Sequence, residues 1–153
     1  MPSVPPSNYA NEIYLRGLGG ERPTWPTDPA VLETYAQERV AGEPFWYVAG
    51  AAGNGATYRA NLAAFDRWRI VPRMLAGATQ RSAASSIFGR ELPAPVITAP
   101  IGVQGILHPD GELAVARVAG ELGLPMAVST VSSYTLEEIA AANGQGERWF
   151  QLY

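Results

Sequence analysis

The sequence predicts an α/β fold with a parallel sheet, and three observations support this prediction. Short apolar runs alternate with helical stretches over residues 94–153, in the order strand, helix, strand, helix, strand. Each apolar run has the length of a buried strand. Each helical stretch carries its own start and stop residues. This alternation is typical of parallel strands joined by crossover helices, and it leaves two architectures open, a doubly wound sheet and a (β/α) barrel.

Residues 1–93 differ from the rest because they are rich in aromatic residues, Pro and Gly. The clearest helix of this part lies in TDPAVLETYAQERVAG, where we expect Asp28 as the N-cap, Pro29 as the first helical residue and Gly42 as the end. The segment SSIFGRELPAP predicts a small hairpin that turns at Gly89-Arg90.

Residues 94–153 supply three expected strands and two helices. The strands are expected in APVITAPIG, LPMAVSTVSS and RWFQLY. The first helix lies in HPDGELAVARVAGELG, with Pro109 in its first turn and Gly123 as its stop. The second lies in TLEEIAAANG, where Thr135 and Glu138 have the spacing of a capping box.

Composition and charge exclude several classes of function. Of the 153 residues 47% are hydrophobic, which is typical of a globular protein. The net charge is −3 and the 11 basic residues form no run, so we expect no nucleic-acid partner. The sequence has no cysteine and a single histidine, His108, so we expect no metal site. It begins without the pattern of a secretory signal and has no membrane-spanning run, so we expect a cytoplasmic protein without membrane contact.

Ligands of parallel α/β folds bind at the carboxyl ends of the strands. Here Ser129 and Gln151 follow two of the expected strands and can hydrogen-bond the edge of a flat heterocycle. An equally good interpretation is that Gln151 pairs with backbone groups. Gly102, after the first strand, is either a turn glycine or is small because something flat packs against the backbone there. PIGVQG lacks the full Gly-x-Gly-x-x-Gly pattern of dinucleotide sites.

The run TAPIGVQGILHPDGELAVARVAGELGLPMAVSTVSSYTLEEIA, followed by RWFQLY, resembles the opening of the FMN-dependent α-hydroxy acid oxidase/dehydrogenase family. SNYANEIYLRGLGG and YVAGAAG extend this resemblance through the first half, so that it covers nearly the whole chain. The NEIY..GLGG opening and the glycine of APIG are more similar to the lactate 2-monooxygenase branch than to the oxidase branches.

The resemblance implies a (β/α)8 TIM barrel that binds FMN at its strand ends. Residues 94–153 would form its first three strands, and residues 1–93 an N-terminal helical segment and a hairpin at the barrel bottom, all within one domain of the full protein. The cofactor-binding residues implied are Pro100, Ile101 and Gly102, lying against the flavin ring, and Ser129 and Gln151, hydrogen-bonding its edge.

The resemblance also implies two substrate-binding residues. Tyr47, in YVAG, would bind the substrate carboxylate, and Tyr153 would lie near the reacting hydroxyl. Taken alone, Tyr47 beside Phe45 and Trp46 is typical of core packing.

Glycine at position 102, where many relatives have alanine, implies a roomier pocket that holds the keto acid product longer. His108 is interpreted as structural, because the family's catalytic histidine lies much further along the chain.

The implied activity is the oxidation of a small 2-hydroxy acid, L-lactate on this resemblance, by an enzyme of the lactate 2-monooxygenase or oxidase type. FMN would be reoxidised by oxygen, and the full-length protein is expected to be a homo-oligomer. The family's lysine, base histidine, substrate-gripping arginine and phosphate site would follow Tyr153, so no catalytic residue is predicted here. We therefore expect the first part of a longer protein, inactive alone.

Two other interpretations remain open. One is a non-catalytic barrel fragment that serves as an assembly piece, and the other is a different phosphate-binding barrel. We also expect the isolated chain to be insoluble or molten, because the apolar faces of its strands, including Met126 and Val128, lack five partner strands.

Overall fold

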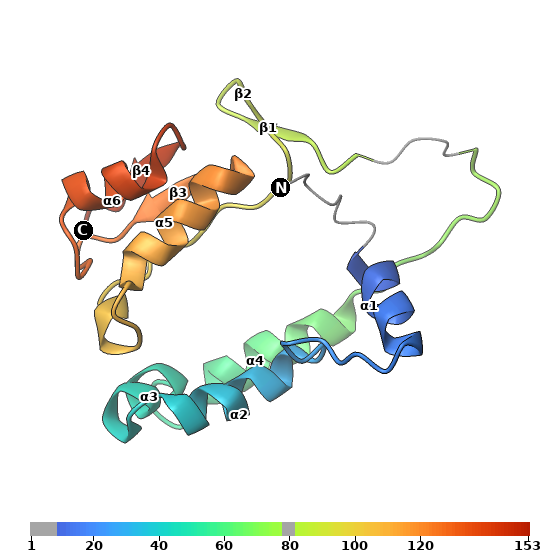
Figure 1. Cartoon of the computed structure of the whole chain (residues 1–153), viewed down its shortest axis with the longest axis horizontal. Coiled ribbons are helices and arrows are strands. Elements are labelled where there is room, and N and C mark those ends of the chain that lie inside the picture. Colours follow the sequence, from blue (N-terminus) through green and yellow to red (C-terminus); the bar gives the residue numbers. More distant parts are fainter. Residues whose placement is uncertain (1–8, 78–81) are drawn as a thin grey trace. The chain divides into compact units, whose positions relative to one another are not determined.

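The computed structural model describes residues 9–77 and 82–153, and it divides the chain into two units, Met1–Ala49 and Gly50–Tyr153. This division falls inside the segment expected to run to residue 93, so the boundary at residue 93 stays a prediction. The described helices of the first unit are α1 (Tyr9–Leu18), α2 (Pro29–Arg39) and α3 (Gly42–Ala49) (Figure 1).

The start of α2 is confirmed, and its predicted end is wrong. The Asp28 carboxylate accepts a hydrogen bond from the backbone N–H of Ala30 at 2.9 Å, as an N-cap does, and Pro29 is the first helical residue. The helix ends before Gly42 because Val40 is already extended, with φ −99°. Gly42 instead begins α3, whose Phe45 is the one buried side chain of that helix.

The second unit contains the predicted alternation of strands and helices. Its elements are α4 (Ala56–Ala64), the 3-10 helix η2 (Phe65–Arg67), β1 (Ser85–Ile87), β2 (Arg90–Leu92), the 3-10 helix η3 (Gln104–Ile106), α5 (Gly111–Leu122), β3 (Met126–Val128), α6 (Leu136–Asn143) and β4 (Arg148–Phe150).

The parallel sheet is confirmed, in a shortened form. β3 pairs with β4 in parallel, and Val128 lies opposite Phe150. The first expected strand is reduced to one parallel bridge, between Thr98 and Met126. Prolines at positions 95 and 100 of this segment lack the N–H that a sheet requires, which accounts for its brevity. The described residues form an α/β arrangement and no closed barrel.

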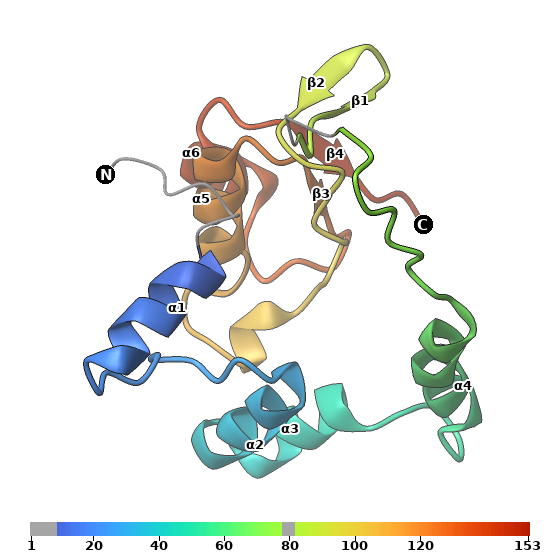
Figure 2. The ribbon, with the colours of Figure 1, turned by 90° about the vertical axis from the view of Figure 1, so that its right-hand side faces the viewer.

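Both crossover helices cover one face of β3 (Figures 1 and 2). The core that they share consists of Ala116 and Ala119 from α5, Met126 and Val128 from β3, and Ile139 from α6. The helices therefore cover Met126 and Val128, which are 2% and 3% exposed, whereas the apolar Phe150 and Leu152 of the next expected strand are 53% and 84% exposed. A (β/α) barrel repeats this arrangement around its circumference.

The start of α5 differs slightly from its sequence signal, and its end agrees with it. α5 begins at Gly111, after a turn formed by Pro109 and Asp110, so Pro109 precedes the helix and does not lie in its first turn. The helix ends as predicted at Gly123, which adopts the left-handed conformation with φ +66°.

The hairpin lies at the amino end of β4, the end opposite the expected ligand site. Its turn is formed by Phe88 and Gly89, one residue earlier than predicted, and both have positive φ, as a type I′ turn requires. The ring of Phe88 packs on Trp149 with 5.8 Å between centroids. The Nε of Arg90 lies 3.8 Å from the carboxylate of Glu147.

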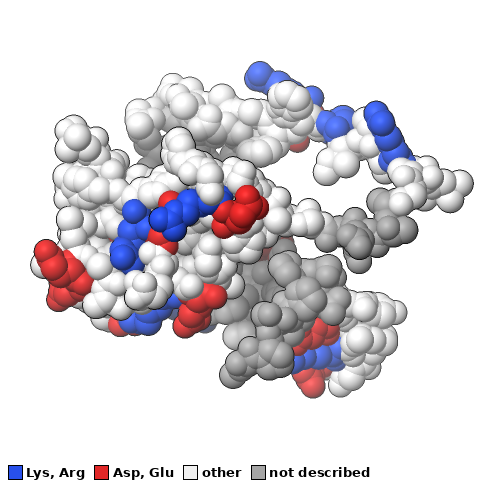
Figure 3. Space-filling model, turned by 90° about the horizontal axis from the view of Figure 1, so that it is seen from above, with Lys and Arg blue, Asp and Glu red and all other residues white. Residues whose placement is uncertain are grey.

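Side chains of both signs share the surface. Figure 3 shows basic side chains next to acidic ones on the face in view, rather than a field of one sign. The pairs Arg16–Glu12, at 2.6 Å, and Arg117–Asp110 are exposed, so each contributes little stability. Within the part of the chain that the structure describes, no helix has the length and hydropathy needed to cross a membrane.

The capping box of α6 gives a testable pH dependence. The Glu138 carboxylate accepts from the N–H of Thr135 at 2.9 Å and from its hydroxyl at 2.8 Å, and these bonds lower the pKa of Glu138 below its usual value of 4.5. A lowered folded-state pKa stabilises the protein above the unfolded pKa, and this contribution is lost as the pH falls through the folded value. We expect Glu138→Gln to flatten the fall of the thermal midpoint below about pH 4.5.

The neighbouring Glu137→Gln is the matched control, because Glu137 lies in the same helical turn and has no described bond to Thr135. Midpoints measured between about pH 3 and pH 7 test this. Equal slopes in wild type and Glu138→Gln would contradict it.

Candidate functional site

The carboxyl ends of β3 and β4 meet through two side chains. Ser129 follows β3 directly and is 4% exposed. Gln151 follows β4, and its N–H donates to the carbonyl of Val128 at 2.9 Å, which extends the parallel pairing by one step. The hydroxyl of Ser129 donates to Oε1 of Gln151 at 3.1 Å.

The chain itself satisfies only one side of the Gln151 amide. Besides Ser129, the backbone N–H of Thr130 donates to the same Oε1 at 3.3 Å. The described residues give Nε2 no acceptor, so this NH2 group is left to donate elsewhere. The interpretation that Gln151 pairs with a backbone group thus holds for Oε1, while its binding of a flavin edge stays a prediction.

Gly102 lies against the same two strand ends. A Cβ placed on it would be 2.9 Å from Oγ of Ser129, 2.5 Å from Cγ2 of Val131 and 2.9 Å from the Val131 carbonyl oxygen. Its φ is not positive, so no turn requires glycine here. The space that a methyl group would take is filled by the neighbouring strand end. The roomier pocket expected at position 102 stays a prediction, since the Cβ direction of Gly102 is occupied by Val131 and Ser129.

The remaining predicted residues of this region are exposed. Ile101 is 60% and Tyr153 is 82% exposed, and Pro100 is exposed beside Ile101. The side-chain amide of Gln104 donates to the Ile101 carbonyl at 2.9 Å and so holds this stretch of backbone. We define the strand-end cluster as the six residues Pro100, Ile101, Gly102, Ser129, Gln151 and Tyr153.

Thr98, at the same expected strand end, does not join the strand-end cluster. Its side chain lines an apolar groove with Val115 and Leu124, on the side of α5. Its Oγ1 is buried there without a hydrogen-bond partner among the described residues.

Tyr47 belongs to the first unit, on α3, and is 71% exposed. Phe45, on the same helix, is the member of the aromatic group that is buried, and it packs edge-on against Trp46 with 5.0 Å between centroids. Core packing therefore does not explain Tyr47, and its role in binding substrate stays a prediction.

Three residues of this region were missed as functional from the sequence. Thr130 binds Gln151 through its N–H and its hydroxyl, and Val131 fills the space beside Gly102. Glu112, for which no role was expected from the sequence, is 1% exposed and bonds two loops. Partners separated by 8 to 29 positions leave no periodic signal, so no pattern in the sequence points to them.

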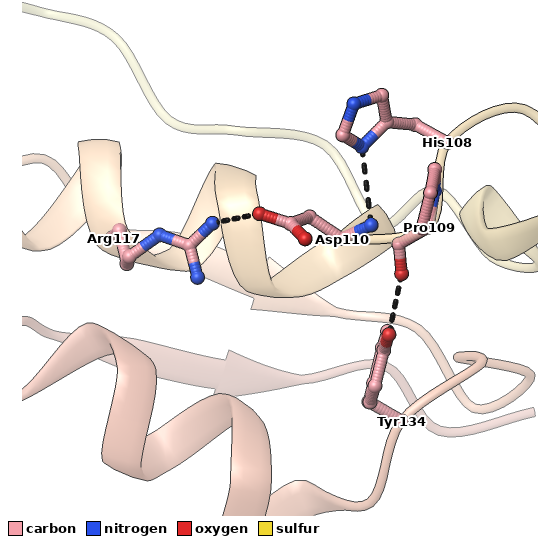
Figure 4. A network of polar contacts seen from close by, with 5 residues as sticks. All are labelled: His108, Pro109, Asp110, Arg117 and Tyr134. Carbon is pink, nitrogen blue, oxygen red and sulfur yellow. Dashed lines mark hydrogen bonds and ion pairs between the residues drawn. The ribbon is translucent and has the colours of Figure 1, made fainter.

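The loop before α5 is anchored by a polar network (Figure 4). Nδ1 of His108 accepts from the N–H of Asp110 at 3.1 Å, and Asp110 pairs with Arg117. The hydroxyl of Tyr134 donates to the carbonyl of Pro109 and so ties this loop to the segment after β3. His108 thus holds the turn before α5 through the N–H of Asp110.

The strand-end cluster has the chemistry needed for the polar edge of a flat ring. It offers the free NH2 of Gln151 as a donor and the Ser129 oxygen as an acceptor. Pro100 and Ile101 beside these groups are exposed. None of the six residues is cationic, so a phosphate group would be held elsewhere. These residues therefore fit the ring of a flavin and not its phosphate.

Comparisons with known proteins give this cluster a context. Residues 36–153 match the family model described as FMN-dependent dehydrogenase. An FMN-dependent α-hydroxy acid dehydrogenase of Penicillium citrinum is 42% identical over 154 residues, which cover 100% of this chain and 38% of the relative.

Two solved structures are similar in fold. A protein described as a lactate oxidase of Pediococcus acidilactici is 36% identical, with a TM-score of 0.81 over 87% of this chain and 37% of its own. A mandelate oxidase variant solved with a C4a-OH-FMN adduct is 43% identical, with a TM-score of 0.74 over 80% of this chain and 36% of its own. The chain thus spans less than two fifths of the length of these proteins.

Proposed function

Because this chain belongs to the family of FMN-dependent α-hydroxy acid dehydrogenases and oxidases, we propose that the protein oxidises a small 2-hydroxy acid, L-lactate, and that oxygen reoxidises its flavin. The observation that carries the proposal is the meeting of three strand ends in one cluster. Ser129 and Gln151 are joined at 3.1 Å, and Gly102 lies directly beside Ser129.

The residues of this chain bind and orient in the proposed reaction. Ser129 and Thr130 fix Oε1 of Gln151, so that its NH2 is aimed as a donor at the edge of the flavin ring. Gln104 holds the backbone at Ile101, which forms a surface for the ring. When bound, FMN supplies the acceptor for the two electrons that leave the substrate.

Two tyrosines of this chain are proposed to contact the substrate, and its single histidine is not proposed to move the substrate proton. Tyr47 and Tyr153 have exposed phenol rings and are proposed to bind the substrate carboxylate and the reacting hydroxyl. His108 is not the base in this proposal, because its Nδ1 accepts a hydrogen bond from the N–H of Asp110 in the turn before α5. No residue of this chain is proposed to abstract the proton.

Which products form when oxygen reoxidises the flavin is a narrower proposal. The resemblance of the opening segment to lactate 2-monooxygenase favours that branch, while the filled space beside Gly102 removes one argument for it. A monooxygenase converts lactate and oxygen to acetate, CO2 and water, and an oxidase converts them to pyruvate and hydrogen peroxide. Product analysis after lactate turnover separates the two.

The decisive test uses the protein as its gene encodes it. We expect bound FMN to absorb near about 450 nm and L-lactate to bleach this band under nitrogen. Failure to bleach with lactate, glycolate or mandelate would overturn the proposed activity. A stable, flavin-free protein would instead favour the non-catalytic assembly role.

A substitution at Gln151 tests the assignment of the flavin edge. Gln151→Leu removes the free NH2 and leaves the Ser129 hydroxyl and the Thr130 N–H without their acceptor. We expect the dissociation constant for FMN to rise about 10- to 100-fold, measured by flavin fluorescence titration. Gln145→Leu, in the exposed loop after α6, is the matched control. An unchanged constant for Gln151→Leu would remove this residue from the site.

A further inference from the structure

A buried carboxylate connects the two loops that carry the strand-end cluster. Glu112, the second residue of α5, is 1% exposed. Its Oε1 accepts from the backbone N–H of Gln104 and from that of Ser133, both at 3.1 Å. Gln104 lies two residues after Gly102, and Ser133 lies four residues after Ser129. One oxygen atom thus joins the loop after the first strand to the loop after β3.

Two further hydrogen bonds join the loop after the first strand to the loop after β3. The N–H of Val103 donates to the carbonyl of Val131 at 3.0 Å, and the N–H of Gly105 donates to the hydroxyl of Ser133 at 2.9 Å. Val103 has φ +53°, a left-handed conformation that is unusual for a β-branched residue. Such a conformation persists only where surrounding contacts hold it, and it is found most often at ligand sites.

The second carboxylate oxygen of Glu112 lowers the stability of the fold. Oε2 is buried and has no hydrogen-bond partner among the described residues. No described ion pair involves Glu112. A buried carboxylate with an unpaired oxygen is poor for stability, although the helix start favours its charge. An apolar side chain would avoid this cost but would leave the N–H groups of Gln104 and Ser133 unpaired.

From this geometry we propose that Glu112 is a positioning residue for flavin binding. Its carboxylate holds the Gly102 loop against the loop that begins at Ser129, and so sets the distance between the surface under the ring and the groups at its edge. Glu112 itself touches neither cofactor nor substrate. This inference rests on the proposed function, and it adds a residue that acts only through the backbone of its neighbours.

Two variants separate the effect of the hydrogen-bond acceptor at position 112 from the effect of its negative charge. Glu112→Gln keeps an oxygen that can accept from both N–H groups, whereas Glu112→Leu has a similar size and no acceptor. Glu121→Leu, at an exposed position of the same helix, is the matched control. All three variants are made in the complete protein that the gene encodes.

The first measurement needs no flavin. We expect the amide hydrogens of Gln104 and Ser133 to exchange at least about tenfold faster in Glu112→Leu, and within about threefold of wild type in Glu112→Gln. The second is the dissociation constant for FMN, expected to rise about tenfold or more in Glu112→Leu and to be restored by Glu112→Gln. The absorption band of the bound flavin should shift only in Glu112→Leu.

The outcomes distinguish a failure of the positioning role of Glu112 from a failure of the proposed function. Faster exchange with unchanged FMN affinity and spectrum would make Glu112 merely structural and overturn the proposal. Unchanged exchange in Glu112→Leu would overturn the connection between the loops itself. A wild-type protein that binds no FMN would overturn the proposed function, and the positioning role with it, while the exchange data would still show whether Glu112 joins the loops.

Discussion

Replacing Gly120 by alanine is expected to lower the free energy of unfolding by about 3 kcal/mol or more. A Cβ at this position would overlap the carbonyl oxygen of Asn143 and lie 3.3 Å from its Nδ2. The obstacle is largely backbone, so no side-chain rotation relieves it. α5 and α6 would have to move apart, although the Asn143 amide binds the Ala116 carbonyl at 2.9 Å between them.

The matched control is Gly17→Ala on α1. Nothing lies within 4 Å of a Cβ placed on Gly17, so this substitution is expected to stabilise its helix by about 0.5–1 kcal/mol. Urea unfolding followed by circular dichroism measures both effects. If Gly120→Ala unfolds at the same urea concentration as wild type, the close approach of α5 and α6 is not present in solution.

Replacing Gly102 by alanine is the second large expected effect, and it acts at the candidate site. The added methyl group would lie 2.5 Å from Cγ2 of Val131 and 2.9 Å from the Val131 carbonyl oxygen. Overpacking of this kind costs about 1–3 kcal/mol. It would also push against Ser129, whose hydroxyl holds Gln151, so we expect weaker FMN binding together with the loss of stability.

A double-mutant cycle tests the cause of this effect. Val131→Ala removes Cγ2, and because Val131 is 48% exposed this change alone should cost little. We expect Gly102→Ala to be partly rescued in the double variant, with a coupling of about 0.5 kcal/mol or more, since the carbonyl oxygen of Val131 remains in place. Strict additivity of the two changes would show that Val131 is not what position 102 meets.

The features predicted correctly from the sequence depend on neighbours a few residues apart. Asp28 caps α2 through Ala30, Thr135 and Glu138 form the capping box, and Gly123 ends α5. Each signal involves residues at most four positions apart, so it is readable along the chain. The errors are also local, because the turn at Phe88 and the extended Val40 depend on the backbone conformations of single residues.

The sequence by itself determined the α/β alternation, the caps of the crossover helices and the family to which the chain belongs. It also indicated that Ser129 and Gln151 lie at the carboxyl ends of two parallel strands, where ligands bind. Only the tertiary structure decided that Val131 fills the space beside Gly102, and that Glu112 joins two loops with one oxygen atom. Those contacts are set by the packing of whole helices on strands, and packing acts between residues whose separation along the chain has no fixed period.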